Sequence, residues 1–287
     1  MKVHKNITIQ IVLYEEDQDT VFKCLNNLKN FKVIILDNSN NSELKKKVLE
    51  KFKIYKYFLE NKNLGYSKGH NKIAEFTDSE FLLILNADCL INEENIVNLY
   101  NSFNNHINCG IVAPTTFDNN NKRTLNGSYL PENGDRDKIV NIEGDVCFQA
   151  VLGSAIFIKR SEFINVGKFD EQLFLFFSDY DLCREIKKLK KSVIQTYFSK
   201  AIHSHGTSKV KNFFKRIFLR EFFITYDELI YYYISNNYQL KYNILRKKIN
   251  NYYYKLFISI IILNFKNIVF YLSKILAFYK FRKKLNN

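Results

Sequence analysis

The sequence is poor in the residues that interrupt or cross-link a chain. Its 287 residues include only 2 prolines and 9 glycines, which excludes long Pro-rich or Gly-rich linkers. Its five cysteines are odd in number, widely spaced and without a Cys-x-x-Cys pair. This spacing argues against a disulfide framework and a structural zinc site, and a reducing compartment fits it best.

An apolar leader is also missing from the amino terminus. Residues 1–6 run directly into an apolar strand pattern, without the apolar stretch and small-residue cleavage site of a secretory signal. We therefore expect a cytoplasmic protein. Hydrophobic residues make up 46% of the chain, which is enough to bury a large core and excludes a disordered protein.

Acidic residues are scarce in the last quarter of the chain. Residues 1–208 carry 27 Lys and Arg against 26 Asp and Glu, whereas residues 209–287 carry 16 against 3. Nearly all of the formal net charge of +14 therefore belongs to the second segment. This shift predicts a domain at 1–208 followed by a basic, aromatic-rich extension at 209–287.

Short apolar runs alternate with helical periodicity in the first part of the chain. Strands are predicted at 7–13, 33–36, 54–59 and 81–85, and helices at 20–28, 41–52 and near 68–76. The alternation predicts an α/β fold with a doubly wound, largely parallel, Rossmann-like sheet. Residues 114–143 are polar and turn-rich, so an irregular or hairpin excursion is expected before order resumes at 155–158.

Polar residues follow three of the predicted strands. Tyr14 follows the first strand, Asp37 closes the second, and Asn86 and Asp88 follow the fourth. Ligands of open α/β sheets bind beyond the carboxyl ends of the strands, so these side chains are candidates for one site. Asp37 could accept hydrogen bonds from a nucleobase or a ribose, although helix capping explains its position at least as well.

A run with two glycines precedes the third predicted helix. In NKNLGYSKGHN (61–71), Gly65 and Gly69 would let the backbone approach a ligand and would aim amide groups at a diphosphate. A simple turn before a helix explains the run equally well.

Two residues are candidates for holding a divalent cation. Asp88 could bind Mg²⁺ or Mn²⁺ bridging two phosphates, and His203 could be a second ligand because imidazole suits Mn²⁺ better than Mg²⁺. One carboxylate is a small ligand set, and an ordinary core or surface histidine is the alternative for His203.

The segment Ser178-Asp179-Tyr180-Asp181 begins an amphipathic helix. In a structural interpretation, Ser178 caps the helix and the two acids favour its dipole. In a chemical interpretation, Asp179 is a general base that takes the proton of a sugar hydroxyl as it attacks an anomeric carbon. The pattern alone leaves both open.

Together and in this order, these segments resemble the inverting nucleotide-sugar transferases of glycosyltransferase family 2, particularly their rhamnosyltransferase-like branch. The matching segments cover most of residues 7–208. They are LDNSN (36–40), NKNLGYSKGHN (61–71), LNAD (85–88), GIVAP (110–114), LGSAIFIKRSEFINVGKFDE (152–171), FLFFSDYDLCREI (174–186) and HSHGTS (203–208).

The resemblance implies a GT-A fold in which Asp37 contacts the donor base, Asp88 holds Mg²⁺ or Mn²⁺, and Asp179 is the catalytic base. The further predicted site residues are Tyr14, Asn63, Gly65, Gly69, Asn71 and Asn86 on the donor side, His203 at the metal, and Gly153, Ser154 and Asp181 on the acceptor side. The family usually has Glu-Asp where this chain has Ser178-Asp179, so the first acid is lost while the expected base remains. The Asn-x-Asp metal motif is similar to the motif of the rhamnosyltransferase-like branch, and this similarity supports a deoxysugar donor such as rhamnose.

The basic extension is interpreted as two or three helices. Its apolar stretches, 252–265 and 268–279, are broken by lysines, so neither reaches the roughly 20 apolar residues of a spanning helix. Basic residues near an anionic leaflet contribute about 1 kcal/mol each, which predicts peripheral association with the inner face of the cell membrane. A hairpin packed on the domain is the main alternative, and single-stranded nucleic-acid binding is the weakest.

The sequence thus predicts an inverting, metal-dependent glycosyltransferase that acts by a single in-line displacement. Its predicted acceptor is a glycan or a lipid-linked saccharide in the synthesis of a cell-surface polysaccharide such as an O-antigen or a cell-wall polymer, and no nucleic-acid partner is expected. A non-catalytic nucleotide-sugar binder and a membrane-surface scaffold are the competing hypotheses. Retention of Asp88 and Asp179 argues against both.

Overall fold

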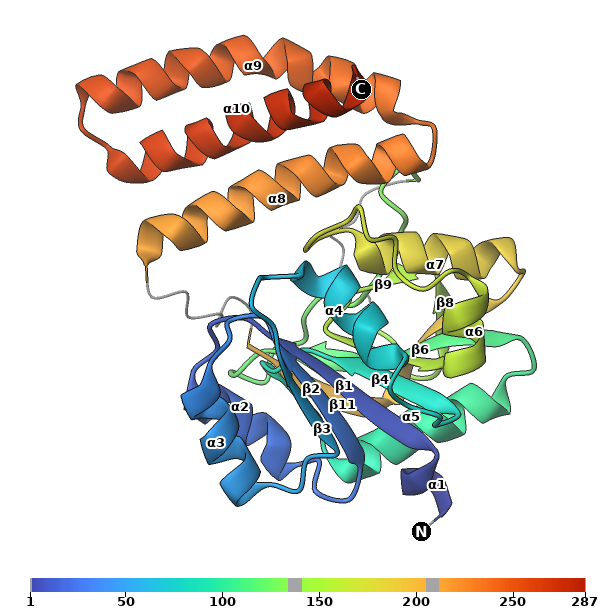
Figure 1. Cartoon of the computed structure of the whole chain (residues 1–287). Coiled ribbons are helices and arrows are strands. Elements are labelled where there is room, and N and C mark those ends of the chain that lie inside the picture. The colour runs from blue at the N-terminus through green and yellow to red at the C-terminus, as the bar shows by residue number, and fades with distance from the viewer. Residues whose placement is uncertain (1, 134–140, 205–211, 287) are drawn as a thin grey trace. The chain divides into compact units, whose positions relative to one another are not determined.

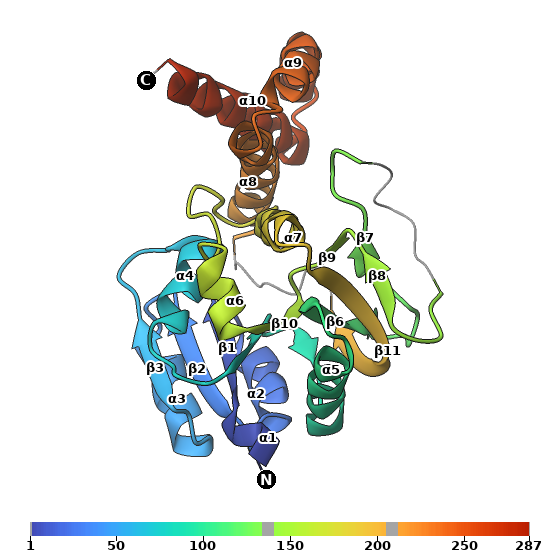
Figure 2. The same cartoon turned by 90° about the vertical axis from the view of Figure 1, so that its right-hand side faces the viewer.

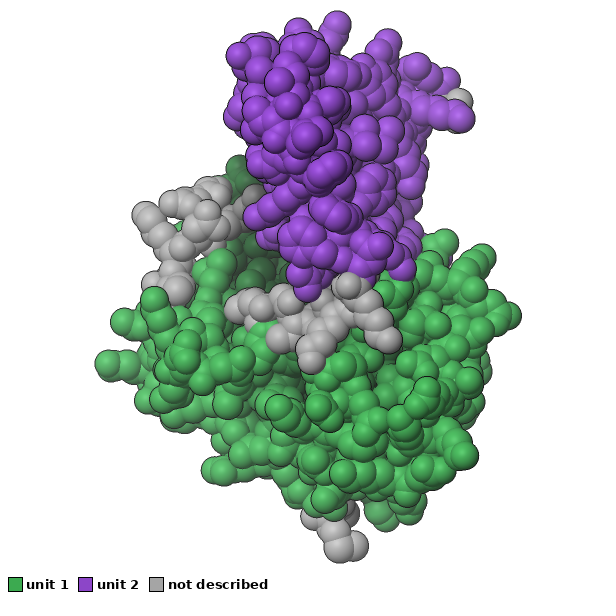
Figure 3. Space-filling model, turned by 90° about the vertical axis from the view of Figure 1, so that its left-hand side faces the viewer, with its two compact units in different colours: residues 1–170, 178–209 green, residues 171–177, 210–287 purple. Residues whose placement is uncertain are grey.

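The computed structural model describes residues 2–133, 141–204 and 212–286. The chain divides into two compact units, shown in Figure 3. The α/β unit comprises residues 1–170 and 178–209, and the helical unit comprises residues 171–177 and 210–287. Segment 171–177 therefore belongs to a different unit from the residues on either side of it.

The α/β unit alternates strands and helices along most of its length (Figure 1). Its helices are α1 (Lys2–Lys5), α2 (Gln18–Asn26), α3 (Ser42–Lys51), α4 (Gly65–Ala74), α5 (Glu93–Asn105), α6 (Arg160–Asn165) and α7 (Ser178–Lys188). Its strands are β1 (Ile7–Leu13), β2 (Lys32–Asp37), β3 (Lys56–Leu59), β4 (Phe81–Leu85), β5 (Cys89–Leu90), β6 (Cys109–Phe117), β7 (Gly127–Ser128), β8 (Val146–Phe148), β9 (Ala150–Val151), β10 (Ala155–Lys159) and β11 (Ser192–His203). The predicted strands and helices of the first part of the chain are confirmed, with shifts of a few residues at their ends.

One central sheet organises the α/β unit (Figures 1 and 2). Its strand order is β3-β2-β1-β4-β10-β6-β11-β5, with β8 paired to β11. Strands β1 to β4 are parallel, as predicted, and β6 is parallel to β11. The sheet becomes mixed beyond β4, because β10 runs antiparallel to both β4 and β6.

Helices cover both faces of the sheet. Successive side chains of a strand point to opposite faces, and β2 shows this directly. Val33 and Ile35 pack in a cluster with residues of α2, α3 and α5, whereas Ile34 and Leu36 pack with Ile73 of α4. The doubly wound α/β arrangement predicted from the sequence is therefore confirmed.

Local capping explains where three of these helices begin. Each of α2, α3 and α5 follows an Asp or Asn whose side chain accepts a backbone N–H three residues further on, and these caps are Asp17, Asn41 and Asn92. A cap of this kind stabilises a helix by about 1 kcal/mol.

The segment predicted to be an irregular or hairpin excursion, 114–143, contains short regular elements. Strand β6 continues through Pro114 to Phe117, and β7 pairs with β9 in a separate two-stranded sheet. Residues 134–140 lie outside the described residues, as do residues 205–208 of the HSHGTS segment.

The helical unit contains α8 (Phe213–Ile234), α9 (Tyr238–Ile261) and α10 (Phe265–Leu285), in agreement with the predicted two or three helices. Helices α9 and α10 share a buried cluster of Ile249, Ile275 and Phe278. A search of the described helices finds none that is long and apolar enough to cross a membrane.

Helix α4 of the α/β unit carries a fully buried histidine, which predicts a pH-dependent stability. The Nδ1 of His70 lies 3.3 Å from the Oε1 of Gln10 on β1, and burial lowers the pKa of His70 to about 3 from an ordinary value of 6.5. Between these values the unfolded chain takes up a proton that the folded chain excludes, so stability falls as the pH falls through this window. We expect the free energy of unfolding to decrease by about 1.4 kcal/mol per pH unit on this account.

Denaturant unfolding measured from neutral to mildly acidic pH checks this expectation. His70→Gln should flatten the dependence between about pH 6.5 and pH 3. Equal slopes in wild type and His70→Gln would contradict it.

Candidate active site

The carboxyl end of β2 is tied to the start of α4. The Nδ2 of Asn38 donates to the carbonyl oxygen of Gly65 at 3.2 Å, and its Oδ1 accepts the N–H of Leu64 at 3.1 Å. Asn63 Oδ1 accepts the N–H of Gly65 at 2.9 Å. Gly65 has a φ of +79°, which glycine adopts without the strain that a Cβ would bring. The predicted donor-binding run is therefore the turn from the sheet edge into α4.

The helix after this turn begins earlier than predicted, at Gly65 instead of near Lys68, so Gly65 starts α4, and Gly69 and Asn71 lie well inside it. A Cβ on Gly69 would lie 2.9 Å from Val12 Cγ2, so this glycine allows α4 to approach β1 closely. The amide of Asn71 both donates to and accepts from the backbone of Phe169, at 2.9 and 3.0 Å. Both residues hold α4 in place, and their contact with a donor stays a prediction.

Asp37 ends β2 with a fully buried carboxylate. Its Oδ1 accepts the N–H of Ser39 at 2.8 Å and the Ser39 hydroxyl, and its Oδ2 accepts the hydroxyl of Tyr57 at 3.2 Å. Burial and the Asp37 charge raise the pKa of Tyr57, which keeps that hydroxyl protonated and donating. Tyr14, at the end of the neighbouring strand β1, is half-buried.

Asp88 and His203 lie together although they are far apart in sequence. Strand β5 pairs with the end of β11, with Cys89 opposite His203, and this places His203 Nε2 3.3 Å from Asp88 Oδ1. Neighbouring ligands of an octahedral ion with bonds of about 2.1 Å lie about 3 Å apart, so this pair fits two positions on one cation. Within the described part of the chain, no three His, Cys, Asp or Glu side chains form a complete metal site.

The residues predicted on the acceptor side, Gly153 and Ser154, join this edge through β10. The N–H of Asn86 donates to the carbonyl oxygen of Ser154 at 3.0 Å, and Ala155 pairs with Leu85. The antiparallel insertion of β10 thus brings the loop containing Gly153 and Ser154 beside Asn86 and Asp88.

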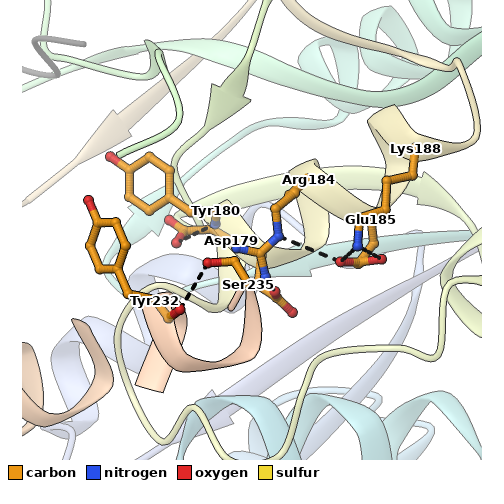
Figure 4. Close-up of polar contacts among 8 residues, drawn as sticks. Asp179, Tyr180, Arg184, Glu185, Lys188, Tyr232 and Ser235 are labelled. Atoms are coloured by element: carbon orange, nitrogen blue, oxygen red, sulfur yellow. Dashed lines mark hydrogen bonds and ion pairs between the residues drawn. The ribbon is translucent and has the colours of Figure 1, made fainter. Parts of the chain in front are cut away.

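Asp179 lies at the start of α7, and its carboxylate is held by backbone groups. The N–H of Gly153 donates to Oδ2 at 2.7 Å. The N–H of Tyr180 donates to Oδ1 at 2.9 Å, as Figure 4 shows. The hydroxyl of Tyr66, on α4, donates to the carbonyl oxygen of Gly153 at 2.9 Å. Burial and the Asp179 charge raise the pKa of Tyr66 well above its ordinary value. Helix α4, the Gly153 loop and Asp179 are therefore linked.

Two further residues of this motif, Ser178 and Asp181, are buried. Ser178, where the family usually has Glu, shares a buried hydrogen bond of 2.7 Å with Ser67 of α4. Asp181, predicted on the acceptor side, is 4% exposed and pairs with Arg184. Burial raises the pKa of Asp181 to about 6, and the Arg184 charge opposes that rise. Its acceptor role stays a prediction.

Sequence reasoning did not single out Tyr66 or Ser67. Both lie inside a motif that it quoted, so the signal was present. Their functions are tertiary hydrogen bonds, however, and no local pattern identifies such partners.

The chain belongs to a family of glycosyltransferases. The family model for glycosyl transferase family 2 matches residues 8–162, more than half of the chain, and this confirms the predicted family. A dTDP-rhamnosyl transferase, RfbF of Shigella flexneri, is 26% identical over 218 residues, covering 73% of this chain and 72% of that protein. The low-salt glycan biosynthesis hexosyltransferase Agl10 of Haloferax volcanii is 24% identical over 218 residues, covering 72% and 69%.

Solved structures confirm the GT-A type of fold. GalNAc-T7, solved with UDP, GalNAc and Mn²⁺, aligns with a TM-score of 0.60 at 14% identity and covers 71% of this chain. The mannosyltransferase PcManGT of Pyrobaculum calidifontis, solved with GDP-Man and Mn²⁺, aligns with a TM-score of 0.54 at 13% identity and covers 77%. The aligned regions span 45% and 62% of those two chains, less than two thirds of each.

Proposed function

We propose that this glycosyltransferase transfers a sugar from a nucleotide-diphosphate donor to a hydroxyl of a glycan or lipid-linked saccharide. The proposed sugar is a deoxyhexose such as rhamnose. The observation that carries the proposal is the Asp179 carboxylate, oriented by two backbone N–H groups beside the Gly153 loop. The deoxyhexose is supported by the likeness to a dTDP-rhamnosyl transferase and by the Asn86-Ala-Asp88 motif. A role in cell-surface polysaccharide synthesis is consistent with both relatives.

In the proposed reaction, Asp179 takes the proton of the acceptor hydroxyl while the acceptor oxygen attacks the anomeric carbon. The bond from that carbon to the diphosphate oxygen breaks in the same step, and the nucleoside diphosphate leaves with the electron pair. A single displacement of this kind inverts the anomeric configuration. Its geometry requires a fixed base, which the start of α7 supplies.

Asp88 and His203 would hold the divalent cation of this reaction. When bound, a cation of this kind neutralises charge that develops on the leaving diphosphate. The 3.3 Å separation of the two donor atoms fits one ion, and the nitrogen ligand favours Mn²⁺ over Mg²⁺. The donor's own phosphates would complete the small protein ligand set.

Turnover of a panel of nucleotide sugars tests the proposed function. The panel contains dTDP-rhamnose, UDP-hexoses and GDP-sugars, each with Mg²⁺ or Mn²⁺ and with membrane extract as the source of acceptors. We expect one donor to be consumed only when metal is present. Donor binding without any turnover would favour the non-catalytic binder instead.

The helical unit supports a second part of the proposal, peripheral contact with an anionic membrane at the inner face of the cell membrane. The end of α9, the turn after it and the start of α10 carry six large apolar side chains that are each at least half exposed, here called the apolar tip: Phe257, Ile260, Ile261, Ile262, Leu263 and Phe265. Lys255 and Lys266 flank it, and residues 209–287 contain 16 basic against 3 acidic residues. Apolar side chains next to cations suit the boundary between acyl chains and anionic headgroups.

Vesicle flotation tests this contact. We expect binding to vesicles with anionic lipid, and an at least tenfold weaker binding for Ile261→Asp with Ile262→Asp, since each buried apolar side chain contributes roughly 1.5–3 kcal/mol. Ile107→Asp, at a fully exposed isoleucine of the α/β unit, is the matched control. Unchanged flotation of the tip variant would contradict membrane contact through the apolar tip. If the wild-type chain instead forms a dimer that the tip substitutions abolish, the apolar tip serves self-association.

A further inference from the structure

The segment before the proposed catalytic helix contains a strained residue. The chain passes from the helical unit to the α/β unit between Phe177 and Ser178, two residues before Asp179. Phe177 has a φ of +66°, in the left-handed region that residues with a Cβ rarely adopt. Such a conformation is strained and persists only where the surroundings impose it.

Two residues of α8 supply that constraint. The Oδ2 of Asp227 accepts the N–H of Leu175 at 2.8 Å and the N–H of Phe176 at 2.9 Å. Tyr231, one helical turn further along α8, packs its ring 5.6 Å from the ring of Phe177. Both α8 residues are fully buried, and their spacing of four places them on one face of the helix.

A buried carboxyl such as Asp227 lowers the stability of the fold, so stability alone does not explain its presence. Its Oδ1 is buried and lacks a hydrogen-bond partner among the described residues, which destabilises the folded state. Burial raises the pKa of the carboxyl to about 6, although loop N–H groups and Lys280 of α10 oppose the rise. Buried polar groups that lack a hydrogen-bond partner are expected mainly at functional or strained sites.

We propose that Asp227 is a positioning residue, which with Tyr231 clamps residues 174–177 and so fixes the backbone that continues into Ser178 and Asp179. This inference rests on the proposed role of Asp179 as the base. Displacement of a catalytic group by about 1 Å can cost about 100-fold in rate, so the clamp has a kinetic consequence. The helical unit then contributes to turnover as well as to membrane contact.

Steady-state kinetics of the full chain separate this role from a merely structural one. For Asp227→Ala, which removes the acceptor for two N–H groups, we expect kcat to fall about 10- to 100-fold while the donor KM changes less than about threefold. Asp227→Asn retains one acceptor oxygen and should restore kcat to within a few-fold of wild type. Glu228→Ala is the matched control, because Glu228 is the next residue on α8 and pairs with Lys241 of α9 at 2.5 Å.

Each outcome decides the proposal. A folded Asp227→Ala protein with wild-type kcat overturns it, and so does an Asp227→Asn protein as slow as Asp227→Ala. If the alanine variant does not fold, Asp227→Thr, whose hydroxyl can accept one of the two N–H groups, should give an intermediate kcat, and wild-type kcat there also overturns the clamp. Full activity of Asp179→Asn would instead reject the proposed function, independently of Asp227.

Discussion

Asp179→Asn is expected to reduce sugar transfer by about 10²- to 10⁴-fold, the usual contribution of a positioned general base. The acceptor hydroxyl would then have no carboxylate to receive its proton during attack. Donor binding, measured by calorimetry with the nucleoside diphosphate and Mn²⁺, should change little because this step does not involve the base. The loss should therefore appear in kcat and not in the donor affinity.

This substitution also alters the local structure, so it needs matched controls. Both oxygens of Asp179 accept backbone N–H groups, and an asparagine offers only one acceptor oxygen. A stability loss of about 1–3 kcal/mol is therefore expected, and thermal unfolding must show that the variant is folded. Glu185→Gln removes a carboxylate from the same helix, where Glu185 pairs with Lys188 (Figure 4), and should keep wild-type turnover. Near-normal kcat in folded Asp179→Asn would refute its role as base.

The second large effect is expected at Asp88. Removal of divalent metal by a chelator should abolish turnover, and Mn²⁺ should restore it in wild type but not in Asp88→Ala. The charge-assisted contribution of such a cation amounts to several kcal/mol, so a loss of at least about 10³-fold is expected. Calorimetry should show that Asp88→Ala no longer gains affinity for the nucleoside diphosphate when Mn²⁺ is added.

His203 offers a sharper test of the same site, because its effect depends on the metal. Replacement of the imidazole by an oxygen ligand, His203→Gln, should lower the ratio of activity with Mn²⁺ to activity with Mg²⁺, since nitrogen ligands favour Mn²⁺. His4→Gln, which alters a histidine paired with Glu93, is the matched control. An unchanged metal preference in His203→Gln would remove His203 from the proposed ligand set.

The predicted strands that were confirmed have strong local signals. Phe81–Leu85 is continuous and apolar because both faces of the sheet are covered, and Ile7–Leu13 has five apolar residues around the polar Thr8 and Gln10. The longest strand, Ser192–His203, was not predicted, because polar residues such as Gln195 and Thr196 interrupt its apolar pattern. Both are buried nonetheless: Gln195 Oε1 accepts the N–H of Gly127, and the carbonyl oxygen of Thr196 accepts the hydroxyl of Thr115.

The sequence by itself determined the α/β class, a C-terminal segment of two or three helices, the concentration of positive charge and the family, because apolar periodicity, composition and short motifs are local properties. Only the tertiary structure decided that β10 enters the sheet antiparallel beside β4, and that β5 and β11 bring Asp88 to His203. It also decided that residues 171–177 join the helical unit, held by Asp227. These contacts connect residues distant in sequence, and their geometry follows from how the whole chain packs.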